Sequence, residues 1–124
     1  MRIATWNVNS VRTRAERIAA FLEREDVDVL AMQETKTADS KFPYATFEAA
    51  GYEVAHVGVS QWNGVAIASR VGLDNVRDSF ERQPAFAKKG DPSVEARAVG
   101  AVCGGVDVWS LYAVSYTHLT LPTN

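Results

Sequence analysis

A strand–helix–strand pattern fills the first 32 residues and restricts the fold more than any other feature. Residues 2–6 have the composition of a strand, and an amphipathic helix is expected over residues 14–24. The apolar residues of that helix recur at helical spacing: Ala15, Ile18, Ala19 and Leu22. The apolar run of residues 27–32 then predicts a second, buried strand. Strand, helix and strand in this order predict a βαβ unit with two parallel strands.

The rest of the chain adds more strands and one short helix. Thr13 and Glu16 have the spacing of a capping box, so we expect the Thr13 side chain to cap the first helix. The further elements expected are a helix from Phe42–Pro43 to Ala50 that ends at Gly51, strands over 52–57 and 64–69, a surface loop over 78–93, and a hairpin of strands 95–103 and 106–112 across Gly104–Gly105. The whole pattern predicts an α/β fold with a mixed sheet.

Composition limits the class of protein without identifying it. The 124 residues suffice for one small domain or part of a larger one, and 47% hydrophobic residues indicate a globular chain. A net charge of −2 excludes a generally basic nucleic-acid-binding protein, but it allows a locally basic rim. Cys103 is the only cysteine, so we expect a buried, inert thiol. Without an apolar run of membrane-spanning length or a signal peptide, a cytoplasmic protein is expected.

Polar residues follow the first two expected strands at the point where each strand ends. Asn7 and Asn9 follow the first strand, and Glu34 follows the second. Ligand sites of open α/β sheets gather beyond the carboxyl ends of strands, so Asn7 and Glu34 should lie close together at that edge of the sheet. We call this edge, beyond the carboxyl ends of the first two strands, the rim. A carboxylate beside an amide oxygen, with no His or Cys nearby, suits a hard cation such as Mg²⁺. This arrangement points to phosphoryl chemistry.

Each of these residues also has an ordinary structural interpretation. Taken alone, Glu34 is more often a solvated residue or a helix cap than a metal ligand, and Asn7 and Asn9 are typical turn residues. The arginines near the rim are more often the solvated face of a helix than phosphate ligands: Arg12, Arg14 and Arg17. His56 is expected to be a partly buried histidine without a functional role. For Trp62 and Trp109, packing is favoured over stacking on nucleotides.

Four segments carry motifs that are more specific than single residues. The first is Ile-Ala-Thr-Trp-Asn-Val-Asn-Ser-Val-Arg at residues 3–12, and the second is Asp-Val-Leu-Ala-Met-Gln-Glu-Thr-Lys at residues 28–36. The third is Asn-Gly-Val-Ala-Ile at 63–67, and the fourth is Trp-Ser-Leu-Tyr at 109–112. In this order the four segments resemble the exonuclease III family of apurinic/apyrimidinic endonucleases. A Gln-Glu pair alone would be weak evidence, whereas the four segments in the family's order are specific.

The resemblance implies a four-layer, DNase I-like α/β sandwich that hydrolyses DNA phosphodiesters 5′ to abasic sites and at 3′ ends. Glu34 would then hold the catalytic Mg²⁺, with Mn²⁺ as an alternative, and Asn7 would help to form the metal site. Tyr112 would bind the reacting phosphate, while Asn9, Arg12 and Lys36 would contact DNA. The expected partner is double-stranded DNA with abasic sites or 3′ ends, bound by a monomer.

Two rival functions remain open at this point. Another phosphodiesterase of the same fold, such as a DNase I-like enzyme or an inositol-phosphate phosphatase, would use the same rim. A non-catalytic nucleic-acid-binding module would use the Arg-rich helix and would bind DNA equally well with EDTA present.

The resemblance stops after Tyr112. The family continues with Val-Pro-Asn-Gly there, whereas Val114–Thr123 resembles the translation of a sequencing-library adapter. We therefore expect residues 1–112 to be the N-terminal half of the domain and residues 113–124 to be foreign read-through, which leaves His118 without a role. The aspartates and histidine of the family's second half are then missing. We expect this chain to be an inactive, aggregation-prone fragment.

Overall fold

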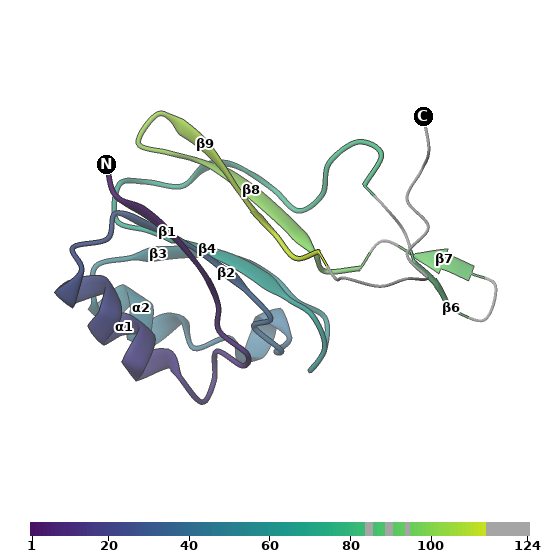
Figure 1. Cartoon of the computed structure of the whole chain (residues 1–124), viewed down its shortest axis with the longest axis horizontal. Coiled ribbons are helices and arrows are strands. Elements are labelled where there is room, and N and C mark those ends of the chain that lie inside the picture. Colours follow the sequence, from purple (N-terminus) through teal and green to yellow (C-terminus); the bar gives the residue numbers. More distant parts are fainter. Residues whose placement is uncertain (84–85, 89–90, 94, 114–124) are drawn as a thin grey trace.

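The computed structural model describes residues 1–83, 86–88, 91–93 and 95–113. The foreign tail expected over 113–124 lies outside these residues except for Ala113. Figure 1 shows the course of the chain, in which two short helices lie beside one sheet and a second sheet lies over that sheet's other face. No helix within the described part of the chain is long and apolar enough to cross a membrane.

A four-stranded mixed sheet forms the centre of the fold. Its strands are β1 (Ile3–Asn7), β2 (Val29–Gln33), β4 (Val65–Ser69) and β3 (Glu53–Val57), in the order β1-β2-β4-β3. β1 and β2 are parallel, and the other two pairs are antiparallel. The predicted parallel pair and the predicted mixed sheet are therefore confirmed.

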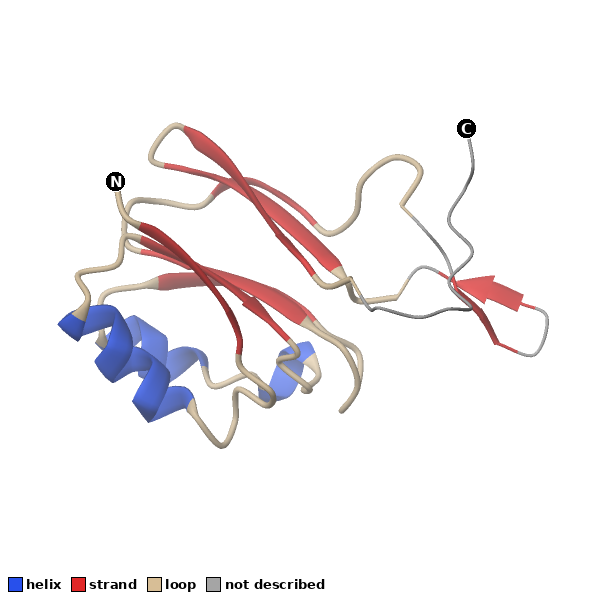
Figure 2. Ribbon diagram, viewed as in Figure 1, coloured by secondary structure: helices blue, strands red, loops and turns tan. Residues whose placement is uncertain are grey.

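Two helices cover one face of this sheet, as Figure 2 shows. They are α1 (Ala15–Arg24) and α2 (Tyr44–Ala49), and a 3-10 turn over Asp39–Lys41 precedes α2. The apolar stripe of α1 is buried through Ile18 and Leu22, which pack in one core with Leu30 and Met32 of β2. Burying each such side chain contributes about 1.5–3 kcal/mol. This packing is the reason that the helical periodicity was a reliable signal.

The predicted capping box is wrong. The residue before α1 is Arg14, and no side chain caps the helix. The Thr13 hydroxyl instead donates to the backbone oxygen of Ser10 at 3.5 Å and accepts from Arg14 Nη1 at 3.1 Å. Thr13 belongs to the turn before the helix, so its hydroxyl is used there rather than at the helix N-terminus.

The second sheet packs against the other face of the first. Its strands are β5 (Asp74–Arg77), β8 (Ala98–Cys103) and β9 (Val106–Leu111), all antiparallel, in the order β5-β8-β9. Gly104 and Gly105 form the predicted hairpin turn with φ of +55° and +83°, a two-residue turn that requires positive φ at both positions. The short, exposed β5 was not predicted, because it shows no alternation of apolar residues and its pairing is irregular.

One part of the predicted surface loop is wrong as well. Residues 78–93 include β6 (Phe86–Lys88) and β7 (Asp91–Ser93), which form a two-stranded antiparallel sheet. Each of these strands has only three residues, which is too short for a periodic sequence pattern to indicate it.

The two sheets share a compact apolar core. Val29 and Ile67 of the first sheet pack against Val99, Ala101 and Cys103 of the second. Because residues alternate across a strand, this contact explains why both faces of β2 and β4 are buried. The prediction of a buried cysteine is confirmed, and burial raises the pKa of the Cys103 thiol.

The outer face of the second sheet has no helix over it within the described residues (Figure 2). Trp109 lies there over Gly100, where a Cβ atom would come within 2.6 Å of the indole ring. The Arg77 guanidinium stacks on the same indole at 4.7 Å, and Phe80 meets it edge-on at 5.8 Å. The prediction that Trp109 is a packing residue is confirmed.

β1 and β9 are the strands at one edge of the two sheets, and an open cavity of about 380 Å³ lies between them. Ile3 and Leu111 are about half exposed along this edge. Open strand edges with exposed apolar residues are sites where further chain can pair. β1 and β9 therefore leave open edges in the described part of the fold, as an aggregation-prone fragment would have.

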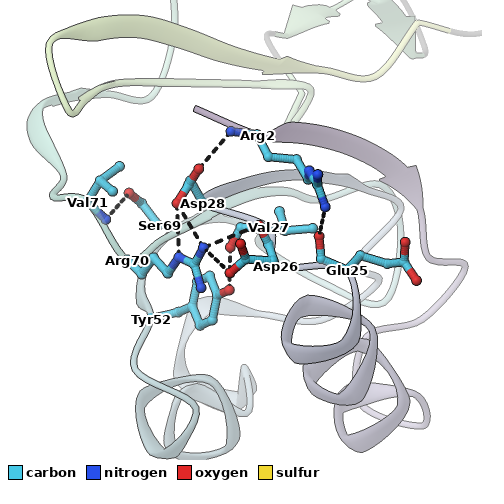
Figure 3. Close-up of polar contacts among 9 residues, drawn as sticks. All are labelled: Arg2, Glu25, Asp26, Val27, Asp28, Tyr52, Ser69, Arg70 and Val71. Carbon is cyan, nitrogen blue, oxygen red and sulfur yellow. Dashed lines mark hydrogen bonds and ion pairs between the residues drawn. The ribbon is translucent and has the colours of Figure 1, made fainter.

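An ionic cluster ties β2 to its neighbours at its amino end (Figure 3). Asp28 accepts hydrogen bonds from the backbone N–H of Arg2 at 2.7 Å and from Arg70 Nε at 3.0 Å. These bonds lower the pKa of the Asp28 carboxyl, with the backbone bond from Arg2 as the largest cause. Arg70 also contacts Asp26 at 2.7 Å, and the hydroxyl of Tyr52 donates to the backbone oxygen of Val27. The cluster lies at the end of β2 opposite to Glu34.

Candidate active site

The carboxyl ends of β1 and β2 bring Asn7 and Glu34 together. In the parallel pair Asn7 lies opposite Gln33, so Glu34 is the next residue beyond the sheet. Asn7 Nδ2 donates a hydrogen bond to Glu34 Oε2. The predicted juxtaposition of the two side chains is thus present in the structure.

Lys36 and Asn9 extend this pair into a polar network. Lys36 Nζ donates to Asn9 Oδ1 at 2.6 Å and lies 3.6 Å from Glu34 Oε1. The backbone N–H of Asn9 in turn donates to Asn7 Oδ1 at 3.2 Å. The side chains of Glu34 and Lys36 are 23% and 32% exposed, so they are held by neighbours and still open to a ligand.

The backbone around this network is strained at several non-glycine positions. Residues with positive φ gather at the rim: Asn9, Ser10, Glu34, Lys36 and Asn63. A non-glycine residue in this conformation costs about 1–3 kcal/mol, and such strain persists only where surrounding contacts hold it. Three backbone hydrogen bonds of 2.8–3.0 Å provide those contacts. The N–H groups of Ser10 and Val11 donate to the oxygens of Glu34 and Thr35, and the N–H of Lys36 donates to the oxygen of Asn63.

The donor set fits a magnesium-type cation in part. Glu34 supplies one carboxylate, and Mg²⁺ in proteins usually binds through one or two carboxylates, waters and substrate phosphate. Within the described residues no group of three or more His, Cys, Asp or Glu side chains could hold a metal ion. Because Asn7 donates to Glu34 through its amide nitrogen, in this conformation it orients the carboxylate and does not present its oxygen to the same position.

A cationic cleft of about 290 Å³ adjoins the network. Three of the side chains that line it are basic: Arg12, Lys36 and Lys41. Ser60 and Gln61 line the same cleft from the loop before β4. Arg12 and Lys36, both expected to contact DNA, therefore line one cleft together with Lys41, for which the sequence supported no prediction. Basic side chains around a polar cleft are suited to phosphate groups.

Trp62 is not a packing residue, contrary to the expectation. Its side chain is 63% exposed on the loop whose neighbouring residues, Ser60 and Gln61, line the cationic cleft. Val59 on that loop is 79% exposed and lines the cleft itself. The composition of the loop gave no signal for this, because a tryptophan between polar residues is compatible with either environment.

Arg14, the residue before α1, contacts the turn that carries Asn9. It was expected on the solvated face of α1, but Nη1 donates to the backbone oxygen of Asn9 at 2.6 Å. The guanidinium thereby supports the strained turn that carries Asn9.

Tyr112 reaches the same end of the fold from the second sheet. Ser110, two residues earlier on the same face, accepts from Gln33 Nε2 at 3.1 Å, and Gln33 directly precedes Glu34. The backbone N–H of Tyr112 donates to the Arg97 oxygen at 2.9 Å, and the Arg97 guanidinium lies 5.0 Å from the centre of the tyrosine ring. The Gln33–Ser110 bond therefore holds the segment that leads to Tyr112 next to the segment that leads to Glu34, although the two belong to different sheets.

Comparison with known proteins agrees with this geometry. The sequence profile described as "Endonuclease/Exonuclease/phosphatase family" matches residues 4–104. Exodeoxyribonuclease III of Haemophilus influenzae is 34% identical over 89 residues, which cover 72% of this chain and 33% of that protein.

Solved structures are similar over nearly the whole chain. An AP endonuclease from Archaeoglobus fulgidus is 40% identical with a TM-score of 0.74, over 90% of this chain and 41% of its own. The 3′-5′ exonuclease NExo from Neisseria meningitidis is 34% identical with a TM-score of 0.77, over 92% of this chain and 42% of its own. A further Neisseria structure shows NExo, there described as a 3′ phosphatase, bound to a product DNA hairpin. The chain thus spans less than half the length of these relatives.

Proposed function

The chain belongs to the endonuclease/exonuclease/phosphatase family, and we propose that it forms the N-terminal part of a divalent-metal-dependent DNA repair nuclease. One observation carries the proposal. The carboxyl ends of β1 and β2 hold Asn7, Glu34 and Lys36 in a hydrogen-bonded and ion-paired network beside a cationic cleft. A carboxylate for a cation next to basic groups for phosphates is the combination that phosphodiester hydrolysis requires.

Each residue of the rim has a proposed role in that chemistry. Glu34 would hold Mg²⁺ or Mn²⁺, which when bound stabilises negative charge on the phosphate oxygens. Asn7 orients the Glu34 carboxylate, and Lys36 balances its charge. Tyr112 would bind the reacting phosphate.

The DNA contacts are proposed to come from the cationic cleft. Arg12, Lys36 and Lys41 would bind backbone phosphates, and Asn9 fixes the position of Lys36 at 2.6 Å. Such contacts position a duplex without reading its sequence. The relatives described as an AP endonuclease and a 3′-5′ exonuclease support double-stranded DNA with abasic sites or 3′ ends as the substrate. We propose that the protein acts on it as a monomer.

We further propose that the 124-residue chain has no useful nuclease activity. The chain covers 33–42% of the length of its relatives, and its described residues offer Glu34 as a single carboxylate at the rim. Within the described residues no water-activating carboxylate then accompanies Glu34, although the residues proposed to bind metal and phosphate are there.

The proposal is tested by titrating the purified chain with Mn²⁺ and following free Mn²⁺ by electron paramagnetic resonance. Glu34→Gln should weaken binding at least tenfold, because it removes the only carboxylate of the network. Glu48→Gln, an exposed position on α2, is the matched control and should leave binding unchanged. Equal Mn²⁺ binding by the Glu34→Gln variant and the parent chain would contradict the metal assignment.

Cleavage and binding of an abasic-site duplex separate the remaining possibilities. Metal-dependent cleavage by the 124-residue chain that is lost in Glu34→Ala would contradict the proposed inactivity. DNA binding that is unaffected by both EDTA and Glu34→Ala, without Mn²⁺ binding, would support a non-catalytic nucleic-acid-binding module instead.

A further inference from the structure

Three polar side chains form a row directly beneath the rim, two of them buried and the third, Asp39, 59% exposed. Thr35 Oγ1 lies 2.7 Å from His56 Nε2, and His56 Nδ1 lies 2.7 Å from Asp39 Oδ1. The side chain of His56 is fully buried, and Thr35 is 0% exposed. Asp39 Oδ1 also accepts the backbone N–H of Gly58 at 3.0 Å, which ties the row to the loop after β3.

The row has one consistent arrangement of protons. Burial lowers the pKa of His56, with Asp39 acting in the opposite direction, so the imidazole is neutral at neutral pH. An ionised Asp39 can only accept, which places the imidazole proton on Nδ1 and leaves Nε2 to accept from the Thr35 hydroxyl. The Nδ1–Asp39 contact is short but poorly aligned for a regular hydrogen bond, so we regard it as mainly electrostatic.

A second hydrolytic centre is excluded by the surroundings of the threonine, although a hydroxyl, an imidazole and a carboxylate in a row resemble one. The ring of Phe42 packs on His56 with 4.5 Å between ring centres. Gly64 lies so close to Thr35 that a Cβ atom there would overlap Oγ1. No substrate atom can therefore reach the threonine hydroxyl, and the row must act on the structure around it.

The structure around it is the segment that carries Glu34 and Lys36. Thr35 lies between these two residues, both of which have positive φ. Its backbone N–H donates to the Gly64 oxygen at 3.2 Å, and its oxygen accepts from Val11 at 3.0 Å. The side chain of Thr35 is thus the buried anchor of a strained, three-residue segment whose outer two side chains face the rim.

We propose that His56 is a positioning residue for the metal site: through Thr35 it fixes the directions of the Glu34 carboxylate and the Lys36 ammonium. This inference rests on the proposed function in so far as Glu34 is the metal ligand. Outer partners of metal ligands orient them, and losing one costs typically about 10- to 100-fold in metal affinity.

The test uses variants that remove the contact between Thr35 and His56 while keeping shape. Thr35→Val and His56→Phe should each weaken Mn²⁺ binding about tenfold or more. The double variant should bind Mn²⁺ no more weakly than the single variant with the lower Mn²⁺ affinity, because each substitution alone already removes the same interaction. Thr35→Ser keeps the hydroxyl and should restore binding to within about threefold of the parent chain, a rescue that mere filling of space would not produce.

Tyr52→Phe is the matched structural control. It removes a buried hydrogen bond to Val27 at the opposite end of β2, so it perturbs the fold without touching Glu34. It should leave Mn²⁺ affinity unchanged. Parent-like Mn²⁺ binding by both Thr35→Val and His56→Phe would overturn the inference, and so would an equal loss in Tyr52→Phe.

A readout without metal separates this inference from the proposed function. In the metal-free chain, the backbone ¹H–¹⁵N resonances of Glu34 and Lys36 should shift in Thr35→Val and His56→Phe and return toward the parent positions in Thr35→Ser. If the parent chain binds no Mn²⁺, the metal assignment fails and these resonances still decide the positioning role. Unmoved Glu34 and Lys36 resonances in both variants would refute it.

Discussion

Gln33 on the first sheet donates from Nε2 to the hydroxyl oxygen of Ser110 on the second, at 3.1 Å. The Ser110 hydroxyl donates a hydrogen bond to the backbone oxygen of Met32 at 2.7 Å, and Gln33 also donates to the Thr5 hydroxyl on β1 at 3.0 Å. The two sheets are therefore joined by a polar link one residue away from Glu34 and two residues away from Tyr112. This link sets the relative position of the two candidate catalytic residues.

Replacing Ser110 by alanine should lower the free energy of unfolding by about 1–3 kcal/mol, because a buried acceptor and donor lose their partner. The midpoint of urea unfolding measures this. Ser79→Ala, at an exposed serine, is the control and should change the midpoint little. Equal midpoints for Ser110→Ala and the parent chain would mean that the link contributes nothing.

Two glycines with nearly the same φ should respond differently to alanine. Gly51 and Gly64 have φ of +92° and +94°, but a Cβ atom is unobstructed at Gly51 and overlaps Thr35 Oγ1 at Gly64. Gly51→Ala should cost about 1 kcal/mol for the left-handed conformation alone. Gly64→Ala should cost about 1–3 kcal/mol more, because the crowded Thr35 must move. Urea unfolding of both variants checks the difference, and equal costs would show that the close contact is unimportant.

The cationic cleft should be visible in the salt dependence of DNA binding. Lys41→Ala should weaken binding of a duplex and reduce the slope of log affinity against log salt by about 1, the effect of one lost phosphate contact. Fluorescence anisotropy at several salt concentrations measures both. Arg24→Ala is the control, because this arginine pairs with Glu25 at the far end of α1. A slope that changes as much in Arg24→Ala as in Lys41→Ala would argue for diffuse attraction.

Acidification should destabilise the protein first through His56. Burial holds the pKa of folded His56 below its ordinary value of 6.5, so the unfolded chain takes up this proton at a higher pH than the folded chain does. Stability from the neutral imidazole is present above about pH 6.5 and declines as the pH falls below that value. Thermal unfolding between pH 7.5 and 5 should show a fall in Tm that is smaller in His56→Phe. A steeper fall in the variant would be inconsistent with a lowered pKa.

A second acid-induced loss should arise at Asp28. Hydrogen bonds from Arg2 and Arg70 lower the pKa of this carboxyl below 3.8, so its stabilising contribution is present above that value and is lost as the pH falls through the folded pKa. Asp28→Asn should weaken this pH dependence, and Arg70→Met should weaken it too by removing one partner. Urea unfolding between pH 5 and 3 measures the effect. An unchanged pH dependence in both variants would exclude the cluster as its source.

The parts of the fold that could be predicted are those with a repeating pattern. The helical spacing of Ile18 and Leu22 predicted their burial, and the helix between β1 and β2 predicted that these strands are parallel. Once that pair is expected, the meeting of Asn7 and Glu34 follows from strand direction alone. Pattern and topology together were therefore sufficient for the centre of the candidate site.

What could not be predicted depends on contacts between segments that are distant in sequence. His56 received no role because its partners, Thr35 and Asp39, come from a different loop. The exposure of Trp62 depends on the path of one loop, and the use of Thr13 in a turn depends on where α1 begins. Neither leaves a periodic signal in the sequence.

The direction of β9 makes the two sides of the described fold unequal as attachment points. Tyr112 ends beside the rim that holds Glu34, whereas Met1 lies against the Gly104 turn at the other end of the hairpin. An affinity tag, dye or fusion partner joined before Met1 would therefore project away from the metal and DNA groups. The same addition directly after Tyr112 would start among them and would compete with the ligands that the experiments above measure.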